Sequence, residues 1–194
     1  RASEHLENGQ IKNSQLTLER AATWNPESVS IRFQQFLLHR NILQVIKSSD
    51  LLDERKTIFA NALLLLNKIE RINPLMGAVP ENRGLLLMEN SDIAVDDWEE
   101  QAILEFNKTL QLHPRLFRAR IALAGLLEDR GELNEAALLM NDGIRYYYDG
   151  YLTGIDKFYQ YAIELNIMNG DTIKAKEIQI EKGLLVVENP GHQY

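Results

Sequence analysis

The chain has 194 residues, of which 45% are hydrophobic and 25% charged, an ordinary composition for a folded protein of one large domain or one short helical array. The formal net charge of −7 argues against non-specific nucleic-acid binding, which requires clustered Lys and Arg. The absence of cysteine excludes disulfides, thiol catalysis and Cys-based metal sites. The longest strongly apolar run, Ala62–Leu66, is far shorter than the roughly 18 residues that suggest a membrane span.

One helical segment is repeated five times along the chain. Aligned at equal phase, the copies are Gly9–Pro26, Thr57–Pro74, Asp97–Pro114, Gly131–Tyr148 and Gly170–Val187. The fifth residue after each start is small: Ser14, Ala62, Ala102, Ala136 and Ala175. The ninth is large: Leu18, Leu66, Phe106, Met140 and Gln179. Such a repeat is typical of stacked helical hairpins, because one hairpin cannot bury its apolar face alone.

The first half of the chain departs from a regular repeat length. After the first copy, the sequence predicts a helix from about Ser28 to Lys47 that is longer than standard, or is followed by an inserted loop at Ser48–Asp50. The second copy, Thr57–Pro74, follows. The stretch Leu75–Val95 holds glycines and a proline, and we expect it to form one short helix near Asn82–Glu89 with loops on both sides.

The second half is more regular. After the copy Asp97–Pro114, the stretch Phe117–Gly150 has the period of two amphipathic helices, with Gly131 in a turn that favours positive φ. An insertion at Asp149–Ile155 precedes the last hairpin. The final helix, about Thr172–Val187, is predicted to be a solvent-facing cap. Two of its positions are polar where an inner helix would be apolar: Gln179 and Lys182.

The stretch Phe117–Gly150 resembles the tetratricopeptide repeat, whose pattern spans about 34 residues. The matching positions are Leu123, Ala124, Leu127, Gly131, Ala136, Met140 and Gly143, and Tyr148 stands where the family has Pro. The N-terminal segment matches at Ala2, Gly9, Ser14, Leu18, Ala21 and Pro26. The other copies match less closely, but the resemblance covers almost the whole chain.

The resemblance implies an all-α, TPR-like α-solenoid, a right-handed superhelix of about five antiparallel helix pairs. We expect one helical-repeat domain over residues 1–194, with units at about 1–28, 29–76, 77–116, 117–150 and 151–189. Because residue 1 falls inside a repeat, we expect the chain to be a fragment of a longer protein.

The resemblance also implies a concave groove lined by the first helix of each pair, where a protein or peptide segment binds. The groove positions carried over to this chain are Phe33, Leu37, Arg40, Asn41, Arg118, Ile121, Gly125, Glu128, Asp129, Lys157 and Gln160. Some family members grip a C-terminal carboxylate with Lys and Asn at fixed groove positions. Here Ile121 and Gly125 stand at those positions, so that carboxylate clamp is absent from this unit.

Two other clusters have both a binding and a packing interpretation. Six of the seven tyrosines lie between Tyr146 and Tyr161, and Tyr147, Tyr148 and Tyr151 either form an interface, including that of a homodimer, or pack in the enlarged loop. Three arginines follow Pro114 and either bind an anion or form a solvated face. They are Arg115, Arg118 and Arg120.

The sequence predicts no catalytic residue, no metal site and no cofactor. Five of the acids between Gly84 and Asn107 precede or open a helix, where the helix dipole favours them, and they lack the regular ligand loop of a calcium site. They are Asp92, Asp96, Asp97, Glu99 and Glu100. The four histidines form no metal-binding motif, and the chain has no nucleophile elbow or phosphate-binding loop.

The stretch LTLERAATWNP (Leu16–Pro26), with the irregular repeat lengths, is also similar to the helical-repeat tails of bacterial envelope proteins. These include the C-terminal tails of O-antigen ligase and polymerase-like membrane proteins. That resemblance implies a periplasmic accessory module whose parent enzyme carries the catalysis elsewhere. The protein-interaction scaffold, the homo-oligomerisation module and the accessory domain therefore remain three alternatives.

Overall fold

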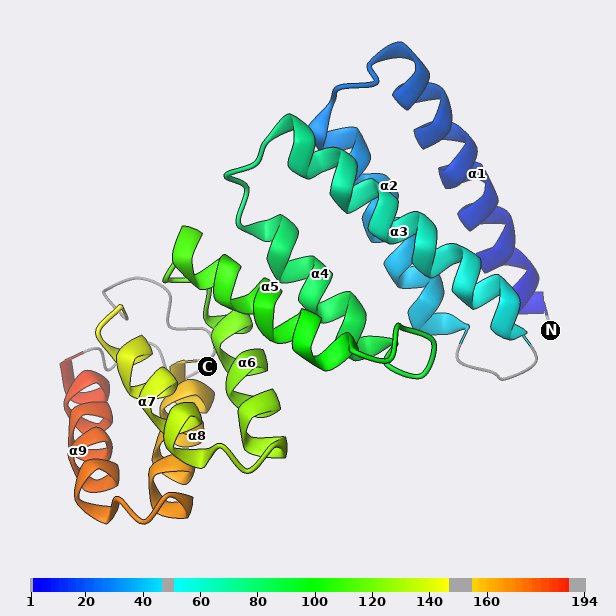
Figure 1. The fold of residues 1–194 in the computed structure, drawn as a ribbon. Coiled ribbons are helices and arrows are strands. Elements are labelled where there is room, and N and C mark those ends of the chain that lie inside the picture. The colour runs from blue at the N-terminus through cyan, green and yellow to red at the C-terminus, as the bar shows by residue number, and fades with distance from the viewer. Residues whose placement is uncertain (1, 47–50, 147–154, 189–194) are drawn as a thin grey trace. The chain divides into compact units, whose positions relative to one another are not determined.

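The computed structural model describes residues 2–46, 51–146 and 155–188, and Figure 1 shows that this part of the chain is built from helices. The helices are α1 (Ala2–Trp24), α2 (Val29–Val45), α3 (Leu52–Ile72), α4 (Ala78–Glu89), α5 (Trp98–Leu112), α6 (Phe117–Asp129), α7 (Leu133–Ile144), α8 (Ile155–Met168) and α9 (Thr172–Glu188). The predicted all-α class is confirmed.

The helices form two compact units, unit 1 over residues 1–105 and unit 2 over residues 106–194, and α5 crosses their boundary. Each unit is described separately below. The prediction that residues 1–194 form a single domain stays a prediction.

Unit 1 is centred on α2, which packs against both α1 and α3. These three long helices run alongside one another in Figure 1. Helix α2 begins after Ser28, whose hydroxyl oxygen accepts a hydrogen bond from the backbone N–H of Ile31 at 3.3 Å and so caps the first turn. The helix ends at Val45, two residues before the predicted end, and the loop predicted at Ser48–Asp50 lies outside the described residues.

Helix α4 differs from its prediction. It begins at Ala78, four residues before the predicted start at Asn82, and it ends at Glu89 as expected. Pro80 lies in its first turn, where backbone N–H groups have no partner within the helix, so the missing N–H of proline costs nothing there. The proline that predicted a loop is therefore part of a helix start.

The small and large positions of the repeat form the contacts between helices. In α3 the residues five, nine and twelve places after the start of the copy are Ala62, Leu66 and Ile69, and all are fully buried. The equivalent α7 residues, Ala136, Met140 and Gly143, are also buried. Small side chains let the helix backbones approach, and the large ones fill the space beside that contact.

Unit 2 contains two tight helical hairpins, α6–α7 and α8–α9, joined by packing of α7 against α8. Each hairpin turns at a glycine with positive φ, 75° at Gly131 and 83° at Gly170, which confirms the turn predicted at Gly131. Helix α9 begins at the predicted Thr172 and ends one residue later than expected. Its Gln179 is exposed and its Lys182 is half-buried, and that α9 caps the array stays a prediction.

Candidate functional site

The first helices of the two hairpins in unit 2, α6 and α8, lie side by side. The rings of Phe117 and Phe158 meet edge to face with centroids 5.2 Å apart. Further along, the Tyr161 hydroxyl donates a 2.6 Å hydrogen bond to the carboxylate of Glu128. These two contacts join α6 to α8, and we call the surface that the two helices form together the α6–α8 face.

Predicted groove residues from both helices lie on the α6–α8 face. Ile121 is 38% exposed and Gly125 lies opposite Tyr161, where an added Cβ would be 3.8 Å from the tyrosine oxygen. On α8, Lys157 and Gln160 are exposed, and Gln160 donates to Glu164 at 2.9 Å. Arg118 and Asp129 are also exposed. The surface therefore combines an aliphatic side chain with charged groups of both signs.

A hollow of about 340 Å³ continues this surface on α8 and α9. Its lining residues are Asp156, Lys157, Gln160, Tyr161, Glu164 and Lys182. Lys182 reaches across from α9 to Asp156, with 3.3 Å between ammonium nitrogen and carboxylate oxygen. Lys182 and Asp156 were not predicted as site residues. The family pattern gives groove positions on first helices, and it does not show which side chain of the second helix α9 comes close to α8.

Burial raises the pKa of Tyr161 well above its ordinary value, and its hydrogen bond to Glu128 raises the pKa further. The phenol therefore stays neutral in the folded chain at pH values where the unfolded chain ionises it. Its contribution to stability is fully present below about pH 10, the unfolded pKa, and is lost as the pH rises above it.

Replacing Tyr161 with Phe is expected to lower the free energy of unfolding at pH 7 by about 1 kcal/mol, because a hydrogen bond to a half-exposed carboxylate is lost. The difference in unfolding free energy between the two proteins should narrow as the pH rises above about 10, because the wild-type advantage is lost progressively from there upward. Urea denaturation at pH 7 and pH 10.5 measures both values. A constant difference across this range would contradict the proton linkage.

The predicted groove residue Arg40 of α2 is 8% exposed and is paired inside unit 1. Its guanidinium binds the carboxylate of Glu89 through two nitrogens, with an Nε–Oε2 distance of 2.9 Å, and Nη1 lies 3.4 Å from the Asn82 side-chain oxygen. Arg40 thus joins α2 to α4. Phe33, another predicted groove residue, is half-buried with its ring 5.8 Å from that of Phe36.

Two more of the acids between Gly84 and Asn107 form ion pairs with arginines of other helices. Asp92 binds Arg55 of α3 at 2.7 Å, and Glu105 of α5 binds Arg83 of α4 at 2.8 Å. Arg83 also binds Glu70 of α3 at 2.8 Å. The helix-start interpretation of the sequence covered Asp92 and did not cover Glu105, which lies inside α5. Their actual partners are arginines on other helices, which the local pattern does not reveal.

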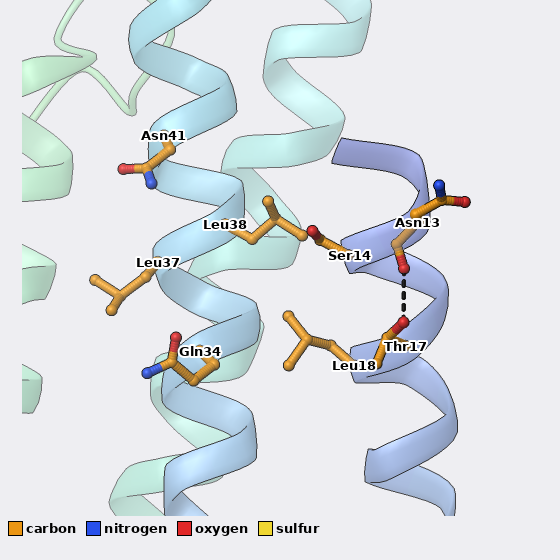
Figure 2. Close-up of a pocket in the computed structure, with 8 residues that line it drawn as sticks. All are labelled: Asn13, Ser14, Thr17, Leu18, Gln34, Leu37, Leu38 and Asn41. Atoms are coloured by element: carbon orange, nitrogen blue, oxygen red, sulfur yellow. Dashed lines mark hydrogen bonds between the residues drawn. The ribbon is translucent and has the colours of Figure 1, made fainter. Parts of the chain in front are cut away.

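A second hollow, of about 560 Å³, lies between α1 and α2 in unit 1. Its lining residues are Asn13, Ser14, Thr17, Leu18, Gln34, Leu37, Leu38 and Asn41. Figure 2 shows Leu18 and Leu38 pointing into the space between the helices, while Thr17 donates to the backbone oxygen of Asn13 at 2.8 Å. Leu37 and Asn41 are two of the four groove residues predicted on α2.

The other two candidate clusters have some buried members, whereas Arg115 and Arg118 are exposed. The Arg120 guanidinium is buried and donates to the backbone oxygens of Leu139 at 2.7 Å and Pro114 at 3.1 Å, so it does not form an exposed anion site. Tyr159 is buried and donates to Glu181 at 3.2 Å. The three tyrosines predicted at an interface lie outside the described residues: Tyr147, Tyr148 and Tyr151.

Comparison of the structure with solved proteins identifies the kind of fold. MamA 41-end from Desulfovibrio magneticus RS-1 is similar with a TM-score of 0.60, 13% identity, and coverage of 98% of this chain and 93% of that one. A thermophilic TPR protein of Thermus thermophilus gives a TM-score of 0.61, 16% identity, and coverage of 86% and 78%. The chain has a TPR-like fold. At these identities the likeness shows the fold alone.

No protein-family model matches the chain, and no curated protein matches it either. The comparisons give no support for a link to O-antigen ligase or polymerase-like membrane proteins. Within the described residues, no helix combines the length and hydropathy that crossing a membrane requires. The same part of the chain holds no cluster of three metal-ligating side chains.

Proposed function

We propose that this TPR-like chain is a protein-interaction scaffold without turnover of its own, and that the α6–α8 face binds a segment of a partner protein. The observation that carries the proposal is the contact between Tyr161 and Glu128, which fixes two first helices beside each other with Ile121, Lys157 and Gln160 accessible. Repeat folds use such surfaces to bind extended or helical segments, although the fold alone does not decide function.

The composition of the α6–α8 face favours a partner segment with an aliphatic anchor and charges of both signs. Ile121 offers an exposed aliphatic contact on α6. Lys157 and Glu164 offer opposite charges two helical turns apart on α8, and Gln160 between them offers an amide. Exposed charges of this kind set the orientation of a bound segment more than its affinity.

Selection of a displayed random-peptide library on the immobilised chain tests the proposal. We expect selected peptides to lose at least about tenfold in affinity with Ile121→Asp, because a charge then occupies the apolar contact. Lys157→Glu should shift the selection toward basic peptides. Leu138→Asp on α7 is the matched control, since Leu138 is 58% exposed on a second helix. Peptides that bind equally well to the Ile121→Asp chain would refute the proposed site.

A further inference from the structure

The second helices of the repeats carry an exposed leucine at one repeated position. The seventh residue after the start of each copy is leucine in four of the five copies: Leu16, Leu64, Leu104 and Leu138. These side chains are 44%, 50%, 68% and 58% exposed, in that order. The fifth copy has Glu177 at this position. Large apolar side chains that solvent reaches at the same place in four repeats indicate an interaction surface.

Leu64 and Leu138 are exposed although their helices have neighbours on both sides. Helix α3 packs against α2 and α4, and α7 packs against α6 and α8. These contacts bury the residues five and nine places after the start of each copy, and they leave the leucine seven places after the start exposed. Each leucine therefore lies on the outer side of its helix, which the adjacent helices of the array do not cover.

The charges beside Leu64 and Leu138 have opposite signs. One turn after Leu64, Lys68 is exposed, and Arg71 one turn later is exposed as well. One turn before Leu138, Glu135 is exposed. Eleven places after the start, the first three copies have a base and the last two an acid: Arg20, Lys68, Lys108, Asp142 and Glu181. Such complementary charges favour contact between the outer side of α3 and that of α7.

We propose that copies of this chain associate through these sides, with α3 of one copy antiparallel to α7 of another and Leu64 against Leu138. In an antiparallel pair, the residue one turn after Leu64 comes opposite the residue one turn before Leu138, so Lys68 lies beside Glu135. In a parallel pair Lys68 would instead meet Asp142, which already binds Arg145 at 2.5 Å. Self-association adds to the proposed function and uses a surface separate from the α6–α8 face.

Light scattering after size exclusion, over about 1 μM to 1 mM of the whole chain, measures the association. We expect the mass to rise with concentration. Leu64→Asp and Leu138→Asp should each weaken association at least about tenfold, because a charge then occupies the leucine contact. Ile167→Asp on the first helix α8 is the matched control, since it places the same charge at a 54% exposed aliphatic residue. Circular dichroism checks that each variant is folded.

Mixing the two leucine variants identifies which sides meet. The Leu64→Asp chain keeps an intact α7 side, and the Leu138→Asp chain keeps an intact α3 side. The mixture should therefore form a complex that neither variant forms alone. Contact between two copies of α3 would instead leave the Leu138→Asp chain associating like the wild type, and contact between two copies of α7 would leave the Leu64→Asp chain doing so. Either of these results would overturn the proposed pairing.

Exchanging charges tests the antiparallel register. Lys68→Glu and Glu135→Lys should each weaken association at least about threefold, because like charges then meet across the contact. A chain with both substitutions should recover the wild-type association, because its new glutamate lies beside the new lysine of the other copy. A double variant as weak as the single variants would overturn the register.

A chain that stays monomeric up to about 1 mM, or a mass increase that neither leucine variant reduces, would overturn the inference as a whole. The Ile121→Asp chain should associate like the wild type. The Leu138→Asp chain should still bind the library peptides. Self-association and partner binding at the α6–α8 face can therefore fail separately.

Discussion

Replacing Gly143 with Ala is expected to destabilise unit 2 by about 1–3 kcal/mol, because the added methyl group has no space. A Cβ at this α7 position would be 2.5 Å from Cδ of Arg120 and 2.6 Å from Cζ of Phe158. Arg120 is held by its bonds to two backbone oxygens, and the Phe158 ring is fully buried, so neither can move aside easily. The gain of about 0.5–1 kcal/mol from removing a helix glycine offsets only part of this cost.

Gly183→Ala in α9 is the matched control. Nothing lies within 4 Å of the position of its added Cβ, so only the helix-propensity gain remains and the variant should be more stable by about 0.5–1 kcal/mol. Urea denaturation followed by circular dichroism measures both variants. Equal and favourable shifts in both would show that Arg120 and Phe158 do not close the space around Gly143.

Replacing Arg83 with Met is expected to destabilise unit 1 by about 2–4 kcal/mol. The Arg83 guanidinium lies between the carboxylates of Glu70 and Glu105, at 2.8 Å from each, and also donates to the side-chain oxygen of Asn67 at 3.0 Å. Its removal takes a positive charge from between two largely buried acids and separates α4 from its links to α3 and α5. Breaking a fully buried pair costs about 3–5 kcal/mol, and the partial exposure of these side chains reduces that figure.

Arg145→Met is the control of matched chemistry, because the Arg145 side chain is 66% exposed and binds Asp142 on the surface of α7. Its unfolding midpoint should stay near that of the wild type. Thermal and urea denaturation of both variants test the contrast. A midpoint for Arg83→Met as high as that of Arg145→Met would mean that the three-helix link contributes little to the stability of unit 1.

The sequence predicted the regular half of the fold better than the irregular half, for a physical reason. In Phe117–Gly150 each position of the pattern has one local structural role, such as the turn at Gly131 or the close helix contact at Ala136. Residue type and spacing are therefore enough to predict these helices. Helix α4 instead buries most of its residues, including Pro80 and Asn82, so no amphipathic period marks its start.

The predicted groove residues show the same limit. Ile121, Lys157 and Gln160 are accessible on α6 and α8, because unit 2 follows the pattern from which these positions were carried over. Arg40 has a groove position in α2 but is buried against Glu89 of α4. An ion pair between residues far apart in the sequence produces no periodic pattern. The sequence therefore contains Arg40 and Glu89 but does not show that they are in contact. Whether the remaining groove residues bind a partner stays a prediction.

The ion pairs of unit 1 also bear on the order in which the chain is made. Arg40 and Glu89 are 49 residues apart, and Arg55 and Asp92 are 37 apart. Synthesis on a ribosome proceeds from the N-terminus, so α2 and α3 leave the exit tunnel while their arginines are still hydrated. Arg40 and Arg55 cannot form these ion pairs until α4 and the loop after it have also emerged. The hairpins of unit 2 join neighbouring segments, so each can close soon after it emerges. A pause in translation before residue 92 would therefore prolong the stage in which α2 and α3 have emerged without the carboxylates that pair with their arginines.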